Sequence, residues 1–347
     1  MVPDLADVLA VTTAFALPMR RQFRGVDLRE GVLIHGPSGW GEWAPFPEYG
    51  DDVAAVWLAG ALEAAFGSWP APVRDRIPVN AIIPGTGAQD AYAMTCAAVR
   101  ETGCTTVKVK VGERGAGLNT ISQDVARVSA VHAALVDCGV RAQGAIRIDA
   151  NTVWTLDEAT EALTLLDDAA GGLDYAEQPC ATLVELAALR TRVSVRIAAD
   201  ESIRTADDPM RAAAEGAIDL IVVKATPLGG VQRALDVVAA AGVPCVVSGA
   251  LDSAVGLAAG IAHAAALPTL DGACGLGTGA LLAADVVRTP LVPTDGSLPV
   301  GRIAPDAEAL AAATDRMSRD RATWWFERLH RAYAHLGQST ALGSQRG

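Results

Sequence analysis

The fold of this chain is decided by three short stretches: AIRIDAN at residues 145–151, LDYAEQP at 173–179 and VRIAADES at 195–202. Each stretch is an apolar run that ends in an acidic residue, namely Asp149, Glu177 and Asp200. The acidic residues follow one another at intervals of 28 and 23 residues, about the length of one strand, one helix and two turns. The spacing predicts a repeated β-α unit that brings one carboxylate from each strand to a common edge.

Two further runs flank these three and end in lysine. TTVKVKVGE at residues 105–113 carries Lys108 and Lys110, and DLIVVKATPLGG at 219–230 carries Lys224. Side chains two residues apart on a strand share a face, so Lys108 and Lys110 are expected to point into the same space. Their neighbouring positive charges, and a bound cation, would favour the neutral amine that a catalytic base needs. Alternatively, KVKV is typical of a solvent-facing edge strand.

Three carboxylates at successive strand ends predict a site for Mg²⁺, with Mn²⁺ as a substitute, because both ions bind oxygen ligands. Sites for softer transition metals recruit histidine or cysteine, and neither residue type stands at these strand ends. Taken singly, each acidic residue could instead cap a helix, and Lys224 could form a Schiff base with a carbonyl substrate. Three evenly spaced carboxylates opposite lysines favour the metal site.

Further residues near the strand ends are candidates for supporting roles. Arg147 and Glu201 are expected beside the metal ligands rather than on the ion, and Asn151 is expected to contact the substrate. The Gly-rich turns at Ser248–Gly249 and Gly275–Leu276 are predicted to bring backbone N–H groups close to a substrate carboxylate. Tight turns alone would account for the same glycines.

The strand–helix period runs through the middle of the chain. Seven apolar, β-branched runs alternate with helical stretches, and an eighth run near residues 270–276 is weaker. Polar residues at several strand ends favour a closed barrel over an open doubly wound sheet, which gathers ligands mainly at one switch point. We expect an α+β capping domain at 1–80, a catalytic barrel at 81–288 and a C-terminal segment, 289–347, that packs with the capping domain.

Composition argues against several classes of protein. The chain has 347 residues, 51% of them apolar, and a formal net charge of −12. It has no basic stripe for nucleic acid and no apolar run of membrane-spanning length. Its six cysteines are scattered without a CxxC pair, and the N-terminus lacks a signal-peptide pattern. We expect a cytoplasmic enzyme with no nucleic-acid or membrane partner, with a monomer slightly favoured over a homo-oligomer.

The motifs K-x-K, D-A-N, E-Q-P, A-D-E-S and K-x-x-P-L-G-G follow one another, beginning at Lys108, Asp149, Glu177, Ala199 and Lys224. In this order they resemble the enolase superfamily, in the branch that contains muconate-lactonizing enzyme. The resemblance covers nearly the whole chain. It implies an α/β fold, a modified (β/α)7β TIM-type barrel with an α+β capping domain formed by both chain ends. Residues 18–49, 248–256 and 275–279 are most similar to the actinobacterial o-succinylbenzoate synthase family.

This resemblance implies a lyase that acts on a small-molecule carboxylate. The reaction is the Mg²⁺-dependent syn-dehydration of 2-succinyl-6-hydroxy-2,4-cyclohexadiene-1-carboxylate to o-succinylbenzoate, a step of menaquinone biosynthesis. Lys110 would act as the base and then the acid, Lys108 would assist it, and Lys224 would stabilise the ring anion from the opposite face. Phe23 and Arg24 would close over the succinyl tail. The alternative is an isomerase of the same branch, such as an N-succinylamino acid racemase, with Lys110 and Lys224 as paired bases.

Overall fold

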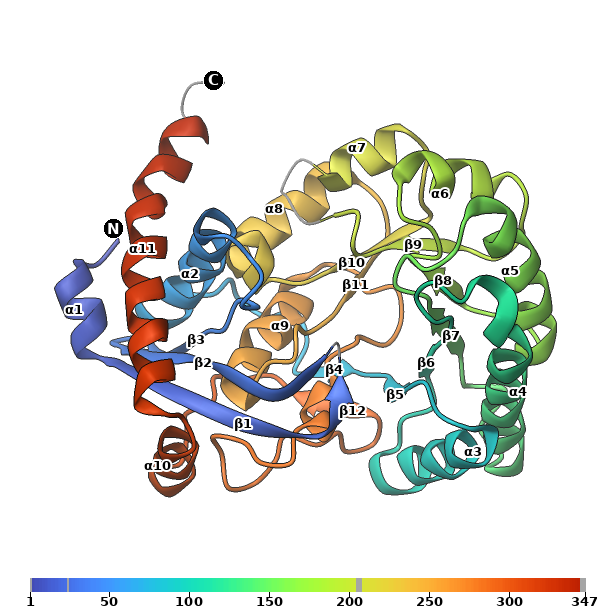
Figure 1. Ribbon diagram of the computed structural model, residues 1–347, viewed down its shortest axis with the longest axis horizontal. Helices are drawn as coiled ribbons and strands as arrows, with labels where there is room; N and C mark the ends of the chain where they lie inside the picture. The colour runs from blue at the N-terminus through green and yellow to red at the C-terminus, as the bar shows by residue number, and fades with distance from the viewer. Residues whose placement is uncertain (1, 24, 204–207, 344–347) are drawn as a thin grey trace.

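The computed structural model describes residues 2–23, 25–203 and 208–343. Figure 1 shows a parallel sheet surrounded by helices, next to a smaller antiparallel sheet that packs with helices from both ends of the chain. The helices α1 (Leu5–Ala10) and α11 (Arg319–Gly343) contact each other at this smaller sheet. There the Tyr333 hydroxyl donates a hydrogen bond to the carbonyl of Pro3, 330 positions earlier in the chain.

The larger sheet contains seven parallel strands, which neighbour one another in sequence order. They are β5 (Ala81–Ile83), β6 (Val107–Lys110), β7 (Ile146–Asp149), β8 (Tyr175–Glu177), β9 (Ile197–Ala199), β10 (Leu220–Val223) and β11 (Cys245–Val247). The strands are short and largely buried, because side chains fill the inside of the curled sheet and helices cover its outside.

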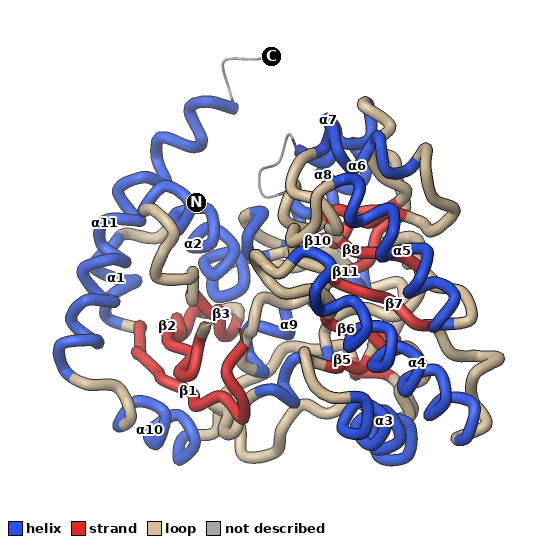
Figure 2. The backbone as a smooth tube through the Cα atoms, turned by 45° about the vertical axis from the view of Figure 1, so that its right-hand side comes forward, coloured by secondary structure: helices blue, strands red, loops and turns tan. Residues whose placement is uncertain are grey.

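Helices connect successive strands and lie outside the sheet, as Figure 2 shows clearly for α3, α4 and α5. They are α3 (Ala88–Ala97), α4 (Ile121–Asp137), α5 (Leu156–Ala170), α6 (Leu183–Arg190), α7 (Asp208–Ala214), α8 (Val231–Ala241) and α9 (Ala254–Ala266). Short helical turns join them: η1 (Ala98–Thr102), η2 (Gly117–Thr120), η3 (Thr226–Leu228) and η4 (Gly277–Leu281). Capping boxes start two of the helices, with Thr155 and Glu158 at α5 and Thr182 and Glu185 at α6.

The ring of strands is closed by a segment that is not a regular strand. Cys274 forms an isolated parallel bridge with Val79, just before β5, and Gly275 forms another with Ser248, just after β11. The predicted eighth strand at 270–276 is therefore wrong in extent, although the segment lies where that strand was expected. Gly272 has a φ of +89°, which takes the chain out of the extended conformation there.

The smaller sheet is an antiparallel meander of three strands. They are β1 (Thr12–Phe23), β2 (Val26–Gly36) and β3 (Gly39–Trp43), followed by the helix α2 (Asp51–Phe66). Alternate side chains point to opposite faces, so Val32 and Ile34 pack with α2 and α11, and Leu33 packs with Val255 of α9. The module is thus packed against the barrel helix α9 through one face of its sheet.

The C-terminal part of the chain returns to both modules. Strand β12 (Ser297–Pro299) pairs antiparallel with β4 (Arg76–Pro78), and two helices follow, α10 (Ala307–Asp315) and α11. Helix α10 ends before α11 begins, so residues 316–318 separate the two helices. Helix α11 packs on α2, and the rings of Trp43 and Trp325 meet edge to face with centroids 5.6 Å apart. No helix in the described ranges is long and apolar enough to span a membrane.

The predicted fold class is confirmed. The order of strands in the sheet and the bridges that close it are those of a barrel rather than an open doubly wound sheet. The domain limits at residues 80 and 288 stay predictions. Two buried apolar clusters support the arrangement, one inside and around the barrel and one between the small sheet, α2 and α11. Ala250 and Leu251, which follow β11, belong to the second cluster, so the two modules share part of one core.

Candidate active site

A cavity of about 50 Å³ lies at the carboxyl ends of β6 to β10. Its lining includes Lys108, Lys110 and Lys224, which are the only three lysines in the sequence. A second cavity of about 210 Å³ adjoins it, and the two have Phe46 and Lys224 in common. Carboxyl ends of barrel strands are where active sites of this architecture lie.

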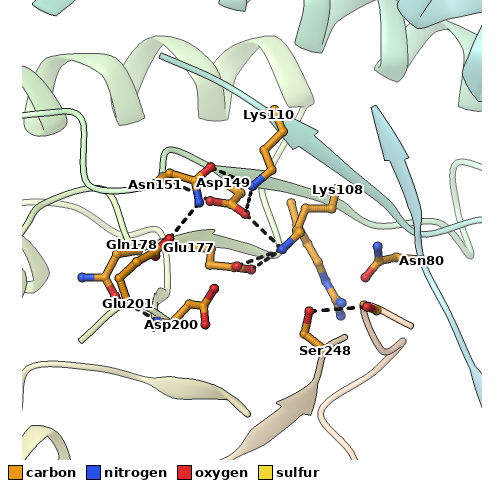
Figure 3. A network of polar contacts seen from close by, with 12 residues as sticks. Asn80, Lys108, Lys110, Asp149, Asn151, Glu177, Gln178, Asp200, Glu201 and Ser248 are labelled. Carbon is orange, nitrogen blue, oxygen red and sulfur yellow. Dashed lines mark hydrogen bonds and ion pairs between the residues drawn. The ribbon is translucent and has the colours of Figure 1, made fainter. Parts of the chain in front are cut away.

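Lys108 is held by two carboxylates from the neighbouring strands (Figure 3). Its Nζ lies 2.8 Å from Oε1 and 2.9 Å from Oε2 of Glu177, and 3.1 Å from Oδ2 of Asp149. Burial favours the neutral amine, but the charges of Glu177 and Asp149 outweigh burial and raise the pKa of Lys108 well above its usual value. The predicted preference for a neutral amine is therefore not found at Lys108, because the carboxylates dominate its surroundings.

Lys110, on the same strand, shares Asp149 with Lys108. Its Nζ lies 2.5 Å from Oδ2 of Asp149 and 2.7 Å from Oδ1 of Asn151. The amide nitrogen of Asn151 donates to Oε1 of Glu201 at 2.9 Å. Asn151 has a φ of +47°, which is uncommon for a residue other than glycine and places its side chain between these groups. Glu201 thus reaches the cavity through Asn151.

Lys224 and Asp200 face each other from adjacent strand ends, and the lysine ammonium donates to Oδ1 of the carboxylate. Gln178 holds the backbone at Asp200 in place. Its Oε1 accepts hydrogen bonds from the backbone N–H groups of Asp200 and Ser202 at 2.9 and 3.1 Å. The amide nitrogen of Gln178 in turn donates to the carbonyl of Cys180 at 2.9 Å. A fully buried glutamine therefore orients one of the predicted metal ligands.

The three carboxyl groups differ in their ionisation. Burial and then the negative charge of Asp149 raise the pKa of Glu177 to about 8. Burial also acts to raise the pKa of Asp149 and Asp200, but here the lysines prevail. Lys110 and Lys108 hold the pKa of Asp149 below its usual range, and Lys224 does the same for Asp200. The lysines therefore stabilise the charges of Asp149 and Asp200, whereas the charge of Glu177 is disfavoured beside Asp149.

The donor set fits a hard divalent cation in its chemistry. Two buried carboxylates, Asp149 and Glu177, and the half-buried Asp200 supply oxygen ligands from successive strands, and a cation would relieve the repulsion between Glu177 and Asp149. Within the described ranges, no three histidine, cysteine, aspartate or glutamate side chains are arranged to hold a metal ion. Lysine ammonium groups stand between the carboxylates instead. Metal binding therefore requires the carboxylates to exchange lysine partners for the ion.

Other predicted residues lie at varying distances from this cluster. Ser248 and Gly249 line the first cavity, and the Ser248 hydroxyl is 3.4 Å from the carbonyl of Gly275. Leu276 is fully buried in the barrel core, where its Cδ2 would lie 2.7 Å from a Cβ placed on Gly260. Its side chain packs against helix α9 rather than lining either cavity described above, and the predicted approach of its backbone N–H to a substrate stays a prediction.

Arg147 has a different setting from the one expected. Its Nε donates to Oδ2 of Asp174 at 2.7 Å, and its other nitrogens donate to the carbonyls of Ala273 and Asp271. These groups lie near the amino ends of the strands, so Arg147 closes the opposite end of the barrel rather than supporting the carboxylates. The rule that side chains alternate gave the inward direction correctly but not the depth in the barrel.

The two residues predicted to cover the substrate cannot be placed. Arg24 lies outside the described residues, and the Phe23 side chain also lies outside them, although its backbone ends β1. Sequence reasoning missed other cavity residues. Phe46, Ala250, Leu251 and Thr278 line the first cavity, and the sequence gives them no chemical signal beyond the glycines near Thr278.

Comparisons with known proteins agree with this architecture. The family model described as Enolase C-terminal domain-like matches residues 91–309, and Enolase N-terminal domain-like matches residues 14–65. A muconate lactonizing enzyme from Pseudomonas fluorescens has a similar structure, with a TM-score of 0.73 and 22% identity over 87% of this chain and 97% of that one. The L-Ala-D/L-Glu epimerase of Bacillus subtilis has a TM-score of 0.71 and 21% identity over 85% and 96%. At these identities the likeness shows the fold.

Sequence relatives are much more similar. The o-succinylbenzoate synthase of Thermobifida fusca is 50% identical over 318 residues, which is 90% of this chain and 96% of the relative. The o-succinylbenzoate synthase of Mycolicibacterium smegmatis is 48% identical over 333 residues, 96% of this chain and 98% of the relative. With this identity over nearly full length, the chain belongs to the o-succinylbenzoate synthase family of the enolase superfamily.

Proposed function

We propose that this protein catalyses the Mg²⁺-dependent syn-dehydration of 2-succinyl-6-hydroxy-2,4-cyclohexadiene-1-carboxylate to o-succinylbenzoate, a step of menaquinone biosynthesis. The observation that carries the proposal is the match of 46–50% identity to relatives of that name over 90–97% of this chain. The geometry of the cavity supports the same reaction class, because bases, acids and oxygen ligands meet there.

The reaction removes a proton from the carbon next to a carboxylate and then expels the hydroxyl group. Asp149, Glu177 and Asp200 would hold the Mg²⁺, which supplies a Lewis acid for the negative charge that develops on the substrate carboxylate. Lys110, in its amine form, would take the proton. Once protonated, Lys110 would donate to the departing hydroxyl group on the same face, so one side chain serves both halves of a syn elimination.

Lys224 lies on the other side of the carboxylates, since β6 and β10 flank the three strands that carry them. Its ammonium, already held by Asp200, would stay charged and stabilise the ring anion through space. Lys108 lies deeper, with 9% of its side chain exposed, and its raised pKa keeps it charged. We assign Lys108 an electrostatic role beside Lys110 rather than proton transfer.

The adjoining cavity of about 210 Å³ suits the parts of the substrate that do not react. Phe46, Tyr49 and Trp57 line it with Val222 and Leu228, so it offers aromatic and aliphatic contact next to Lys224. Apolar pockets with a few polar groups on one wall are typical of small-molecule sites. The substrate would span the two cavities, with its reacting carbon near Lys110.

Product formation tests this proposal. Purified protein is incubated with the cyclohexadiene substrate and Mg²⁺, and o-succinylbenzoate is quantified by chromatography against an authentic standard. Lys110→Arg is the matched control, because arginine keeps the positive charge but does not become a neutral base. We expect product with the wild type, and formation about 10²–10⁴-fold slower with Lys110→Arg. Equal product from both proteins would refute the role of Lys110, and no product from either would refute the reaction.

A further inference from the structure

Arg29 is a buried cation at the junction of the two modules. It lies on β2 of the small sheet and is 2% exposed. Its Nε donates to the carbonyl of Leu251 at 3.0 Å, and its Nη2 donates to the carbonyl of Ala250 at 3.3 Å and to that of Ala44. No carboxylate among the described residues forms an ion pair with it. Three carbonyl oxygens therefore accept hydrogen bonds from most of the N–H groups of this buried guanidinium.

The segment that Arg29 holds is conformationally unfavourable. Leu251 has a φ of +63°, in the left-handed region that residues with a side chain seldom adopt. Such a conformation persists only where the surroundings fix it, and residues that line functional sites often have it. The Leu251 carbonyl is bound by Arg29, and Oδ2 of Asp252 accepts a hydrogen bond from the N–H of Ala250 at 2.7 Å. The turn is thus clamped from both sides.

The same guanidinium also contacts the facing wall of the cavity. Its central carbon lies 4.7 Å from the centroid of the Phe46 ring, a cation–π contact. Phe46 and Ala250 line both cavities, and Leu251 lines the first. Arg29 therefore contacts both Phe46 of the small module and the Ala250–Leu251 turn of the barrel from behind the cavity, and links these two parts of its lining.

Glu42 of the small sheet also forms hydrogen bonds across this junction. Oε2 of Glu42, on β3, accepts hydrogen bonds from both the backbone N–H and the hydroxyl of Ser253, the residue that caps helix α9. The Gly256 position lets this carboxylate lie against the helix, since a Cβ there would be 2.8 Å from Cδ of Glu42. Arg29 and Glu42 of the small sheet thus hold the four-residue stretch 250–253, which carries Ala250 and Leu251.

We infer that Arg29 is a positioning residue that sets the width of the substrate cavity by holding the Ala250–Leu251 turn opposite Phe46. Arg29 has no contact with the three lysines or the three carboxylates, so its effect falls on substrate binding rather than on proton transfer. This inference rests on the proposed function, because it takes the space between Phe46 and Leu251 as the substrate site. The occupant would be the non-reacting, succinyl-bearing part of the substrate.

The test compares Arg29→Met with Arg74→Met. Arg74 also donates to three carbonyls, those of Ala264, Leu267 and Pro268, but it does so at the far end of α9, away from the cavity. We expect Arg29→Met to raise KM by about tenfold, as loss of one charge-assisted hydrogen bond does, and to change kcat by less than about threefold. Arg74→Met is expected to lower the melting temperature without changing KM.

Two further measurements make the outcome decisive. Arg29→Lys keeps the buried positive charge but loses the planar guanidinium group. It replaces Arg29→Met if that variant does not fold, and we expect a smaller rise in KM from it. Mn²⁺ affinity, followed by electron paramagnetic resonance, should equal that of the wild type in each variant. A folded Arg29 variant with wild-type KM, or one that loses only kcat, would overturn the inference. An inactive wild type would instead refute the proposed function. In that case the binding of o-succinylbenzoate is compared between the two proteins, and weaker binding by Arg29→Met than by the wild type would still support the positioning role.

Discussion

Lys110 on β6 and Asp149 on β7 are direct partners in the sheet register, and their Nζ and Oδ2 atoms lie 2.5 Å apart. The pairing follows from the parallel sheet, in which strand ends that each carry a polar residue must lie side by side. The predicted base and a predicted metal ligand therefore share one contact. A cation bound at the Asp149 oxygen would take over one contact of Lys110, whose hydrogen bond to Asn151 would keep it beside the same cavity.

The two lysines at the edges of the cluster should respond differently to arginine. Lys110→Arg should lower kcat by about 10²–10⁴-fold, because arginine cannot accept the proton. Lys224→Arg should retain more activity, since the proposed role of Lys224 needs only its positive charge. Steady-state kinetics of both variants check this expectation. Equal losses in both would favour two-base chemistry, as in a racemase, over the syn elimination.

Glu177 should link metal binding to stability. Mg²⁺ at 100 times its dissociation constant should raise the free energy of unfolding by about 2.7 kcal/mol in the wild type. Glu177→Gln should reduce this increment and weaken Mn²⁺ binding at least about tenfold, because it removes one of three charged ligands. It also replaces the carboxylate that accepts two hydrogen bonds from Lys108 with a neutral amide that has one acceptor oxygen.

Urea denaturation with and without Mg²⁺ measures the first effect, and metal titration measures the second. Glu185→Gln is the matched control, since Glu185 caps α6 at an exposed position and glutamine also serves in a capping box. An undiminished response to Mg²⁺ in Glu177→Gln would place the metal elsewhere.

Close packing in the small module predicts that a methyl group added at Gly41 strongly lowers the stability of the protein. A Cβ on Gly41 of β3 would lie 2.0 Å from the carbonyl oxygen of Ala61 on α2, and backbone atoms cannot move aside easily. Gly41→Ala should therefore destabilise the protein by about 3 kcal/mol. Gly85→Ala meets no atom within 4 Å and should change stability by less than about 0.5 kcal/mol. Similar urea midpoints for the two variants would show that β3 and α2 do not approach so closely.

His263 should make stability fall in mild acid. It is fully buried in α9, and neither ring nitrogen has a hydrogen-bond partner among the described residues. Burial lowers its pKa from 6.5 to about 3, so the folded protein resists a proton that the unfolded chain accepts. Above about pH 6.5 the buried neutral His263 does not reduce the free energy of unfolding. Below that pH the free energy of unfolding falls by about 1.4 kcal/mol per pH unit, until the pH approaches 3.

A matched variant isolates this effect. His263→Leu keeps an apolar side chain of similar size and cannot take up a proton. The stability difference between His263→Leu and the wild type should be constant above pH 7 and should grow in favour of leucine between pH 6.5 and 5. Urea denaturation across this range measures it, and a difference independent of pH would show that His263 does not titrate between the two states.

The sequence predicted the repeated unit because each buried strand is an apolar run that ends in a charged residue, as at Asp149 and Lys224. It also predicted that the six charged side chains would converge: five of them line the cavity, and the sixth, Glu177, accepts a hydrogen bond from Lys108. It failed at Arg147, because alternation along a strand gives the direction of a side chain but not its depth or its packing partner. The Leu276 side chain packs on helix α9, and the predicted contact of its backbone with a substrate stays a prediction. Both residues lie inside the fold, but neither contacts the carboxylate cluster.

Residues that shape the cavity without chemical groups could not be predicted. Phe46, Ala250 and Leu251 are ordinary apolar residues in the sequence, and only the docking of the small sheet onto the barrel makes them neighbours. Arg29 contacts Leu251 across 222 positions of sequence. Such contacts arise from the packing of two modules, which no local pattern records.

The proposed dehydration is best checked by the initial rate of aromatisation of the cyclohexadiene substrate, followed by ultraviolet absorbance with Mg²⁺ and with EDTA. We expect rapid turnover with Mg²⁺, loss of turnover in EDTA, and recovery when Mg²⁺ is restored in excess. A folded protein that binds Mg²⁺ but leaves the substrate unchanged would contradict it, and so would turnover at the same rate in EDTA.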